Sequence, residues 1–142
     1  MASLETIKED FAFLDDWEDR YRYVIELGRA LPDMDEALKN ETTKVRGCAS
    51  QVWLQAHAGA TDRIELGPTL TFEGDSDAHI VKGLIAILLA LYNGKSARAI
   101  LDTDANAVFA ELGLAEHLTQ QRSNGLASMV ARMRAEADAT LA

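Results

Sequence analysis

Residues 80–91 limit the possible folds of this chain more than any other stretch. Drawn as a helix, the stretch is apolar almost all round, with Ile80, Val81, Leu84, Ile85, Leu88, Leu89 and Leu91. A helix of that kind is buried in a core rather than lying on a surface, and its strongly apolar part is far shorter than the roughly 20 residues that cross a bilayer. We expect a central helix that begins after Gly74, with Ser76 as N-cap, and ends at Asn93-Gly94.

Further helices are expected on both sides of this one. Apolar residues recur at helical spacing from Leu4 to Leu14, and Asp16 can cap a second helix over residues 17–30. The polar stretch 33–46 predicts a loop with one helical turn around Glu36. After the central helix, the pattern predicts two short helices and a longer one, over residues 97–101, 105–112 and 123–137.

In the middle of the chain the hydrophobic period changes to that of strands. Residues 51–58, 63–66 and 69–73 alternate between apolar and polar, with turns at Gly59 and Gly67-Pro68 between them. The order helices, strands, helices predicts an α+β fold, in which helices pack against a small antiparallel sheet of about three strands. No repeat or Gly/Ser-rich linker divides the 142 residues, so a single domain, 1–142, is expected.

Charge and cysteine usage narrow the partners and the compartment. The net charge is −9, which repels phosphate backbones and anionic lipid, so neither nucleic acid nor a membrane is an expected partner. A lone cysteine forms no internal disulfide, which is typical of a reducing compartment. The first 16 residues hold five acidic side chains and no apolar secretory segment. We expect a cytoplasmic protein.

The lone cysteine, Cys48, lies between the polar loop and the first expected strand. Lys44 and Arg46 precede it, and no carboxylate falls within residues 43–54. Nearby cations lower the pKa of a thiol and so raise its thiolate fraction, and Gly47 lets the backbone turn tightly beside the sulfur. Cys48 is therefore a candidate nucleophile, although a small buried structural cysteine is the alternative that the local sequence leaves open.

A single cysteine also restricts the chemistry. It has no second thiol for a thioredoxin-like cycle, and one cysteine with three scattered histidines does not make a zinc motif. Accepting sulfur from the persulfide of another protein needs only one attacking thiolate. A Cys-His hydrolase stays open, because the histidine could be any one of His57, His79 and His117.

Two further groups carry charge at suggestive positions. Asp75 and Asp77 stand where the central helix is expected to start, so they could act as acid and base, bind a partner's cations or compensate the helix dipole. Arg122 could approach the cysteine loop or a partner's carboxylate, or it could be a solvated residue at a helix start.

Taken together, these motifs resemble the SufE family, which includes CsdE. The matching stretches, in order, are Trp17-Glu18-Asp19-Arg20-Tyr21, Glu26-Leu27-Gly28, Leu31-Pro32, Val45-Arg46-Gly47-Cys48-Ala49-Ser50-Gln51-Val52-Trp53, Gly74-Asp75-Ser76-Asp77-Ala78, Ile80-Val81-Lys82-Gly83-Leu84, His117-Leu118-Thr119 and Arg122-Ser123-Asn124-Gly125-Leu126. The Gly-Cys-x-Ser-Gln-Val-Trp and Asp-Ser-Asp-Ala pieces are the most specific.

The resemblance implies both a fold and an activity. The fold should be like those of SufE and the IscU-type scaffolds. The chain should be an accessory protein rather than an enzyme, stimulating a PLP-dependent cysteine desulfurase of the SufS or CsdA type. Cys48 would take the desulfurase's persulfide sulfur and pass it to an iron–sulfur scaffold such as SufBCD. PLP would belong to the partner, and this chain would need no cofactor.

The resemblance also implies a set of site residues. In the family the cysteine loop can tuck its sulfur against a hydrophobic pocket. The matching positions that could serve this loop or bind the partner are Arg46, Gly47, Ser50, Gln51, Asp75, Asp77 and Arg122. A docking-only activator, in which Cys48 carries no sulfur, is the alternative.

Overall fold

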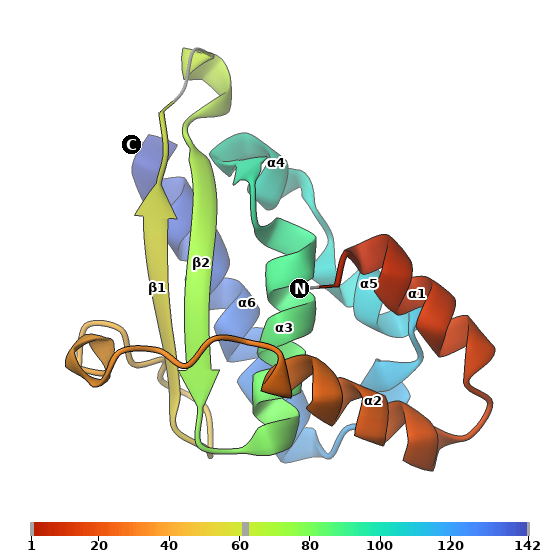
Figure 1. The fold of residues 1–142 in the computed structure, drawn as a ribbon. Helices are drawn as coiled ribbons and strands as arrows, with labels where there is room; N and C mark the ends of the chain where they lie inside the picture. Colours follow the sequence, from red (N-terminus) through yellow and green to blue (C-terminus); the bar gives the residue numbers. More distant parts are fainter. Residues whose placement is uncertain (1, 61–62, 142) are drawn as a thin grey trace.

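The computed structural model describes residues 2–60 and 63–141, and it has the expected α+β architecture (Figure 1). The helices are α1 Leu4–Phe13, α2 Trp17–Arg29, α3 His79–Tyr92, α4 Ala97–Asp102, α5 Ala105–Glu111 and α6 Gln120–Leu141, and the strands are β1 Val52–Ala58, β2 Thr69–Ser76 and β3 Lys95–Ser96. Short 3₁₀ helices lie at Glu36–Leu38, Ile64–Leu66 and Leu114–Glu116.

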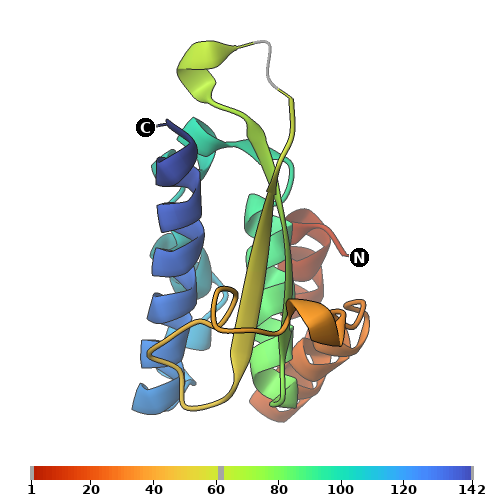
Figure 2. The ribbon, with the colours of Figure 1, turned by 90° about the vertical axis from the view of Figure 1, so that its left-hand side faces the viewer.

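Within the described residues, one antiparallel three-stranded sheet has the order β1-β2-β3. Leu54 lies opposite Gly74 in the register, and both share the apolar face. A Cβ on Gly74 would lie 2.8 Å from Ile85 Cγ2 of α3, so the central helix packs directly on this face. In the view of Figure 1, the loop before β1 crosses in front of the strands and α6 runs behind them; Figure 2 shows the same arrangement turned by 90°.

The prediction of a strand over residues 63–66 is wrong. Residues Ile64–Leu66 form a 3₁₀ helix in the connection between β1 and β2, and the Ile64 side chain is 88% exposed. The third strand is instead β3, which follows α3 and pairs with the start of β2 through Thr69↔Ser96. Apolar residues that alternate in sequence form a strand only where a sheet edge is there to pair with them, and this segment leads away from the sheet.

The central helix is confirmed as buried, with only Lys82 and Ala90 among its interior residues partly exposed. Helix α2 crosses it closely: a Cβ added to Gly28 would lie 2.6 Å from the backbone nitrogen of Gly83. Two glycines at the crossing thus allow the backbones of α2 and α3 to touch. This contact covers the side of α3 that faces away from the sheet.

Two predicted helix boundaries differ from the structure. Ser76 does not cap α3: it is the last residue of β2, and Ala78 takes the N-cap position without a side-chain bond. The last helix begins at Gln120 rather than Ser123, because the Thr119 hydroxyl accepts the Arg122 N–H at 3.2 Å and so starts the helix earlier. This places Gln121 and Arg122 in the first turn of α6.

Candidate functional site

Cys48 lies in a short loop that joins the polar segment to β1. The turn expected at Gly47 is present, with φ of 90°. A Cβ at that position would also collide with the side-chain hydroxyl of Ser128 in α6. Glycine is therefore required there both by the backbone conformation and by the closeness of α6.

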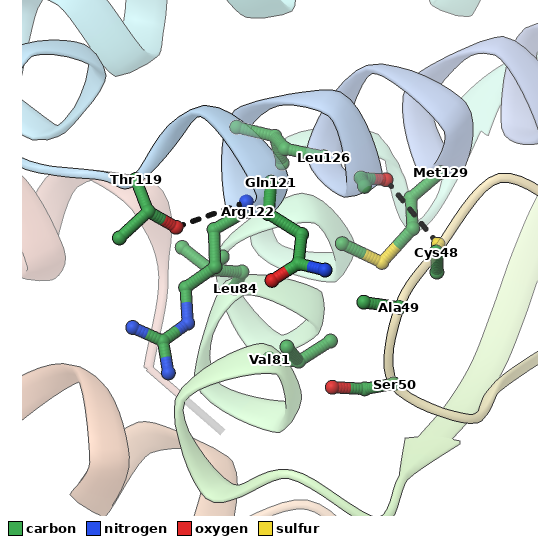
Figure 3. A pocket seen from close by; sticks show the side chains of 11 residues that line it. Cys48, Ala49, Ser50, Val81, Leu84, Thr119, Gln121, Arg122, Leu126 and Met129 are labelled. Atoms are coloured by element: carbon green, nitrogen blue, oxygen red, sulfur yellow. Dashed lines mark hydrogen bonds between the residues drawn. The ribbon is translucent and has the colours of Figure 1, made fainter.

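Beside Cys48 lies a cavity of about 200 Å³ between the loop, α3 and the first turns of α6 (Figure 3). Its apolar wall comes from α3 and α6, and its polar wall from the loop and the start of α6. The lining residues are Cys48, Ala49, Ser50, Val81, Leu84, Thr119, Gln121, Arg122, Gly125, Leu126 and Met129. A cavity of this size can hold several atoms beside the sulfur.

The thiol itself is half-buried and hydrogen-bonded. Cys48 Sγ donates to the carbonyl oxygen of Gly125, 3.5 Å away (Figure 3). Burial raises the pKa of the Cys48 thiol above its usual value, and a carbonyl acceptor favours the protonated form further. In this conformation burial and the carbonyl contact both favour the protonated thiol at neutral pH.

The prediction that nearby cations would lower the pKa of Cys48 is therefore wrong for this state. Arg46 is exposed and pairs with Glu41 at 2.7 Å. Its charge is thus turned toward a carboxylate and solvent, and burial remains the dominant influence on Cys48.

Gln51 and Asp77 tie the end of the cysteine loop to the turn before α3. Asp77 Oδ1 accepts the Gln51 backbone N–H at 3.0 Å. Asp77 is exposed and does not line the cavity. The Asp77 carboxylate therefore holds the end of the cysteine loop in place through this hydrogen bond.

Asp75 has a different environment from Asp77. It is 4% exposed, and its carboxylate accepts the N–H groups of Met34 and Ser76 at 3.1 and 2.8 Å. Lys39 and Lys82 lie 3.3 and 3.4 Å from its oxygens. Burial alone would raise the pKa of Asp75, but these hydrogen bonds and charges outweigh it and hold the pKa below its usual value. Asp75 thus fastens the 33–46 segment onto the sheet.

Ser50 and Arg122 line the cavity with Cys48, from the loop and from α6 (Figure 3). Arg122 is exposed, and within the part of the chain that the structure describes its side chain makes no hydrogen bond or ion pair. It is thus a cation available at the cavity rim.

Of the residues that line the cavity, the sequence predicted a site role only for Cys48, Ser50 and Arg122. Gln121, Gly125 and Met129 share one face of α6, at spacings of four residues, and this face contacts the cysteine loop. The spacing was readable once a helix was expected there, but nothing local connects it with Cys48.

The three histidines do not support hydrolase geometry. His57 pairs with Glu73 at 2.9 Å, and His117 stacks on Trp17 with ring centroids 3.7 Å apart. Among residues 2–60 and 63–141, no histidine lines the cavity or bonds to Cys48. The same residues contain no helix long and apolar enough to cross a membrane.

Comparison with known proteins agrees with the motifs and the fold. Residues 5–137 match SufE, described as an Fe-S metabolism associated domain. An uncharacterized SufE-like protein of Rhizobium meliloti (strain 1021) is 57% identical over 141 residues, 99% of each chain. Another, of Rhizobium etli, is 58% identical over 137 residues, which is 96% of this chain and 90% of that one.

The fold has a counterpart among solved structures. The solution structure of a hypothetical protein from Thermus thermophilus superposes with a TM-score of 0.72 over 97% of this chain and 95% of that one, at 23% identity. With the match over nearly the whole length, the chain belongs to the SufE family, and thus to the proteins of iron–sulfur metabolism.

Proposed function

We propose that this protein receives persulfide sulfur on Cys48 from a cysteine desulfurase, stimulates that desulfurase and delivers the sulfur to an iron–sulfur cluster scaffold. The family is one of sulfur-transfer partners of cysteine desulfurases in iron–sulfur metabolism. The observation that carries the proposal is the place of Cys48, the only cysteine, beside a cavity with room for an added atom.

The transfer is a displacement at sulfur. The Cys48 thiolate attacks the outer sulfur of the desulfurase persulfide and forms a new S–S bond. The old S–S bond breaks, and the desulfurase cysteine leaves as a thiolate with that electron pair. The proton lost by Cys48 balances the one that the leaving thiolate or solvent takes up, so no oxidant is needed. Cys48 then carries the persulfide.

The same proposal names the cofactor, the two partners and the compartment of the reaction. PLP belongs to the desulfurase, which is of the SufS or CsdA type, and this chain contributes no cofactor. The acceptor is a scaffold of the SufBCD type, and the exchange takes place in the cytoplasm. Because the resting thiol is neutral and half-buried, docking has to move the loop or supply a base before Cys48 reacts.

The decisive experiment is to incubate the protein with a PLP-dependent desulfurase and L-cysteine and to measure the intact mass without reductant. One added sulfur, mapped to Cys48 and removed by dithiothreitol, is the expected result. No added sulfur with any desulfurase tried would overturn the carrier role.

A docking-only activator is the second candidate. Cys48→Ser separates the two, because it removes the acceptor sulfur while the loop and cavity can keep their shape. The carrier proposal expects the variant to fold and to bind the desulfurase without stimulating it. Stimulation that survives the substitution would make the protein an adaptor.

A further inference from the structure

We propose that the side-chain amide of Gln121 donates a hydrogen bond to the outer sulfur of a Cys48 persulfide, so that the cavity holds the loaded sulfur as an anion while the Gly125 carbonyl holds the empty thiol protonated. This inference rests on the proposed function, since it concerns the form that Cys48 takes after loading.

The empty and loaded states present different groups to the cavity. In the empty state, Cys48 Sγ carries the hydrogen that it donates to Gly125 O at 3.5 Å. Once a second sulfur is attached, Sγ has no hydrogen to donate. The S–S bond of about 2.05 Å carries the outer sulfur beyond Sγ, and the free space next to Sγ is the cavity.

The outer S–H group of a persulfide is more acidic than a thiol, so it loses its proton more readily. The resulting anion accepts hydrogen bonds and is stabilised by a donor, whereas the thiol of the empty state donates to an acceptor. The polar groups of the cavity that can donate are Thr119, Ser50, Gln121 and Arg122. The Thr119 hydroxyl oxygen accepts the Arg122 N–H at 3.2 Å, and Thr119 stands six residues before Gly125, where α6 meets Cys48, so it is farther along the helix from the sulfur than Gln121 is. Three donors thus remain for the loaded sulfur.

Of these donors, Gln121 lies on the face of α6 that meets Cys48. It stands one helical turn before Gly125, and side chains four residues apart lie on the same face of a helix. Its amide projects into the cavity between Arg122 and the cysteine loop (Figure 3). Among the described residues nothing else holds this amide, whereas the amide of neighbouring Gln120 bonds to Asn124 at 2.9 Å.

The other charges around Cys48 do not replace this donor. On the loop, Arg46 pairs with Glu41. In the turn before α3, Asp77 accepts the Gln51 N–H. Lys44, on the same segment, does not line the cavity. The remaining charges lie on the two helices of the cavity.

The helix charges are likewise directed elsewhere or exposed. On α3, Lys82 contacts Asp33 and Asp75 rather than the cavity, whose α3 wall is apolar. On α6, Arg122 lines the cavity as an exposed cation. Arg122 adds a positive field, and Gln121 supplies a directed bond.

The Gly125 carbonyl and the Gln121 amide thus favour a protonated sulfur in the empty protein and an anionic sulfur in the loaded protein. The empty thiol is neutral and reacts slowly with stray electrophiles. The loaded sulfur is kept as the nucleophile that the next acceptor needs. The substitution at Gln121 should consequently alter the loaded state and spare the empty one.

The test uses a persulfide made without any desulfurase. With one cysteine in the chain, Cys48 can be converted to a mixed disulfide with 2-thiopyridine. Hydrosulfide then displaces the thiopyridine as its thiolate and leaves the persulfide on Cys48. The rate of alkylation by iodoacetamide is measured against pH by intact mass, for both the empty and the loaded protein.

For the loaded protein, we expect Gln121→Leu to move the midpoint of the alkylation profile up by about one pH unit, the size expected for one hydrogen bond to an anion. Gln121→Glu, which adds a negative charge, should move it up further. For the empty protein, the Gln121→Leu midpoint should move by less than about a third of that shift. Gln120→Leu is the matched control and should change neither profile.

Two results would overturn the inference: a loaded profile that Gln121→Leu leaves unchanged, or equal shifts in the loaded and empty profiles. Neither depends on a desulfurase, so a failure here is separate from a failure of the proposed function. That function fails when a desulfurase cannot load the wild-type protein.

Discussion

The backbone N–H of Gln51 donates to Oδ1 of Asp77 at 3.0 Å, and the Asp77 N–H returns a longer bond of 3.3 Å to the Gln51 carbonyl. Because Gln51 stands three residues after Cys48, this pair fixes the end of the cysteine loop against the turn before α3. The side-chain bond is the part that a substitution can remove while the backbone bond stays.

Asp77→Ala should therefore speed the alkylation of Cys48 by iodoacetamide by roughly three- to tenfold at fixed pH, since one hydrogen bond to a charged group holds the loop closed. Asp138→Ala, at an exposed acidic residue of α6, is the control that changes charge without touching the loop. Equal rates in the two variants would mean that Asp77 does not restrain Cys48.

Arg122→Ala should weaken stimulation of the desulfurase several-fold while the melting temperature stays within about 2 °C, because the side chain is exposed and buries little area. The kinetics are measured with excess L-cysteine over a range of protein concentrations. Arg98→Ala removes another exposed arginine, from α4, and should leave stimulation intact. If both variants behave alike, Arg122 acts only through net charge.

Asp75→Asn should reduce the free energy of unfolding at pH 7 by about 3 kcal/mol, because it leaves Lys39 and Lys82 without their shared buried carboxylate. Urea unfolding measures this loss. Asp33→Asn breaks an exposed contact of Lys82 and should cost less than about 1 kcal/mol. Similar losses in the two variants would show that burial at Asp75 adds nothing.

The same carboxylate predicts a pH dependence. The folded pKa of Asp75 is lowered, so its contribution to stability is complete above its unfolded pKa of about 4 and is lost as the pH falls through the lower folded pKa. Asp75→Asn should therefore lose less stability than wild type as the pH falls below about 4. Parallel curves of unfolding free energy against pH would contradict this.

Gly28→Ala should destabilise the protein by about 2–3 kcal/mol, because the added Cβ would lie 2.6 Å from Gly83 N and force α2 away from α3. The sign makes the test sharp, because alanine normally stabilises a helix interior relative to glycine. Thermal and urea unfolding both measure it, and a stabilised variant would show that the two helices can separate freely.

The sequence predicted those parts of the fold in which the pattern and the burial coincide. Residues 80–91 could be predicted as a central helix because almost every side chain is apolar, and a helix that is apolar all round is stable only when it is buried in the core. The short strand Lys95–Ser96 could not be predicted, because two residues are too few to show the alternation of apolar and polar side chains that marks a strand. The alternation in residues 63–66 was misleading because Ile64 is exposed, and hydrophobicity without burial does not distinguish a strand from a turn.

For the site, the motif around Cys48 was visible in the sequence, but its environment was not. Lys44 and Arg46 suggested an acidic thiol. In the structure Arg46 turns to Glu41, and burial decides the pKa instead. The contact with Gly125 joins segments far apart in the chain, so its effect on the thiol appears only once α6 is in place.

The anchors of the cysteine loop set a limit on how far its sulfur can travel. Val45 is held by its bond to Val52 O at 2.8 Å, and Gln51 by Asp77. Each anchor is three positions along the chain from Cys48, a span of at most roughly 10 Å when extended. The loop is a short tether rather than a swinging arm, so a donor or an acceptor has to bring its own reactive atom within that radius of the surface.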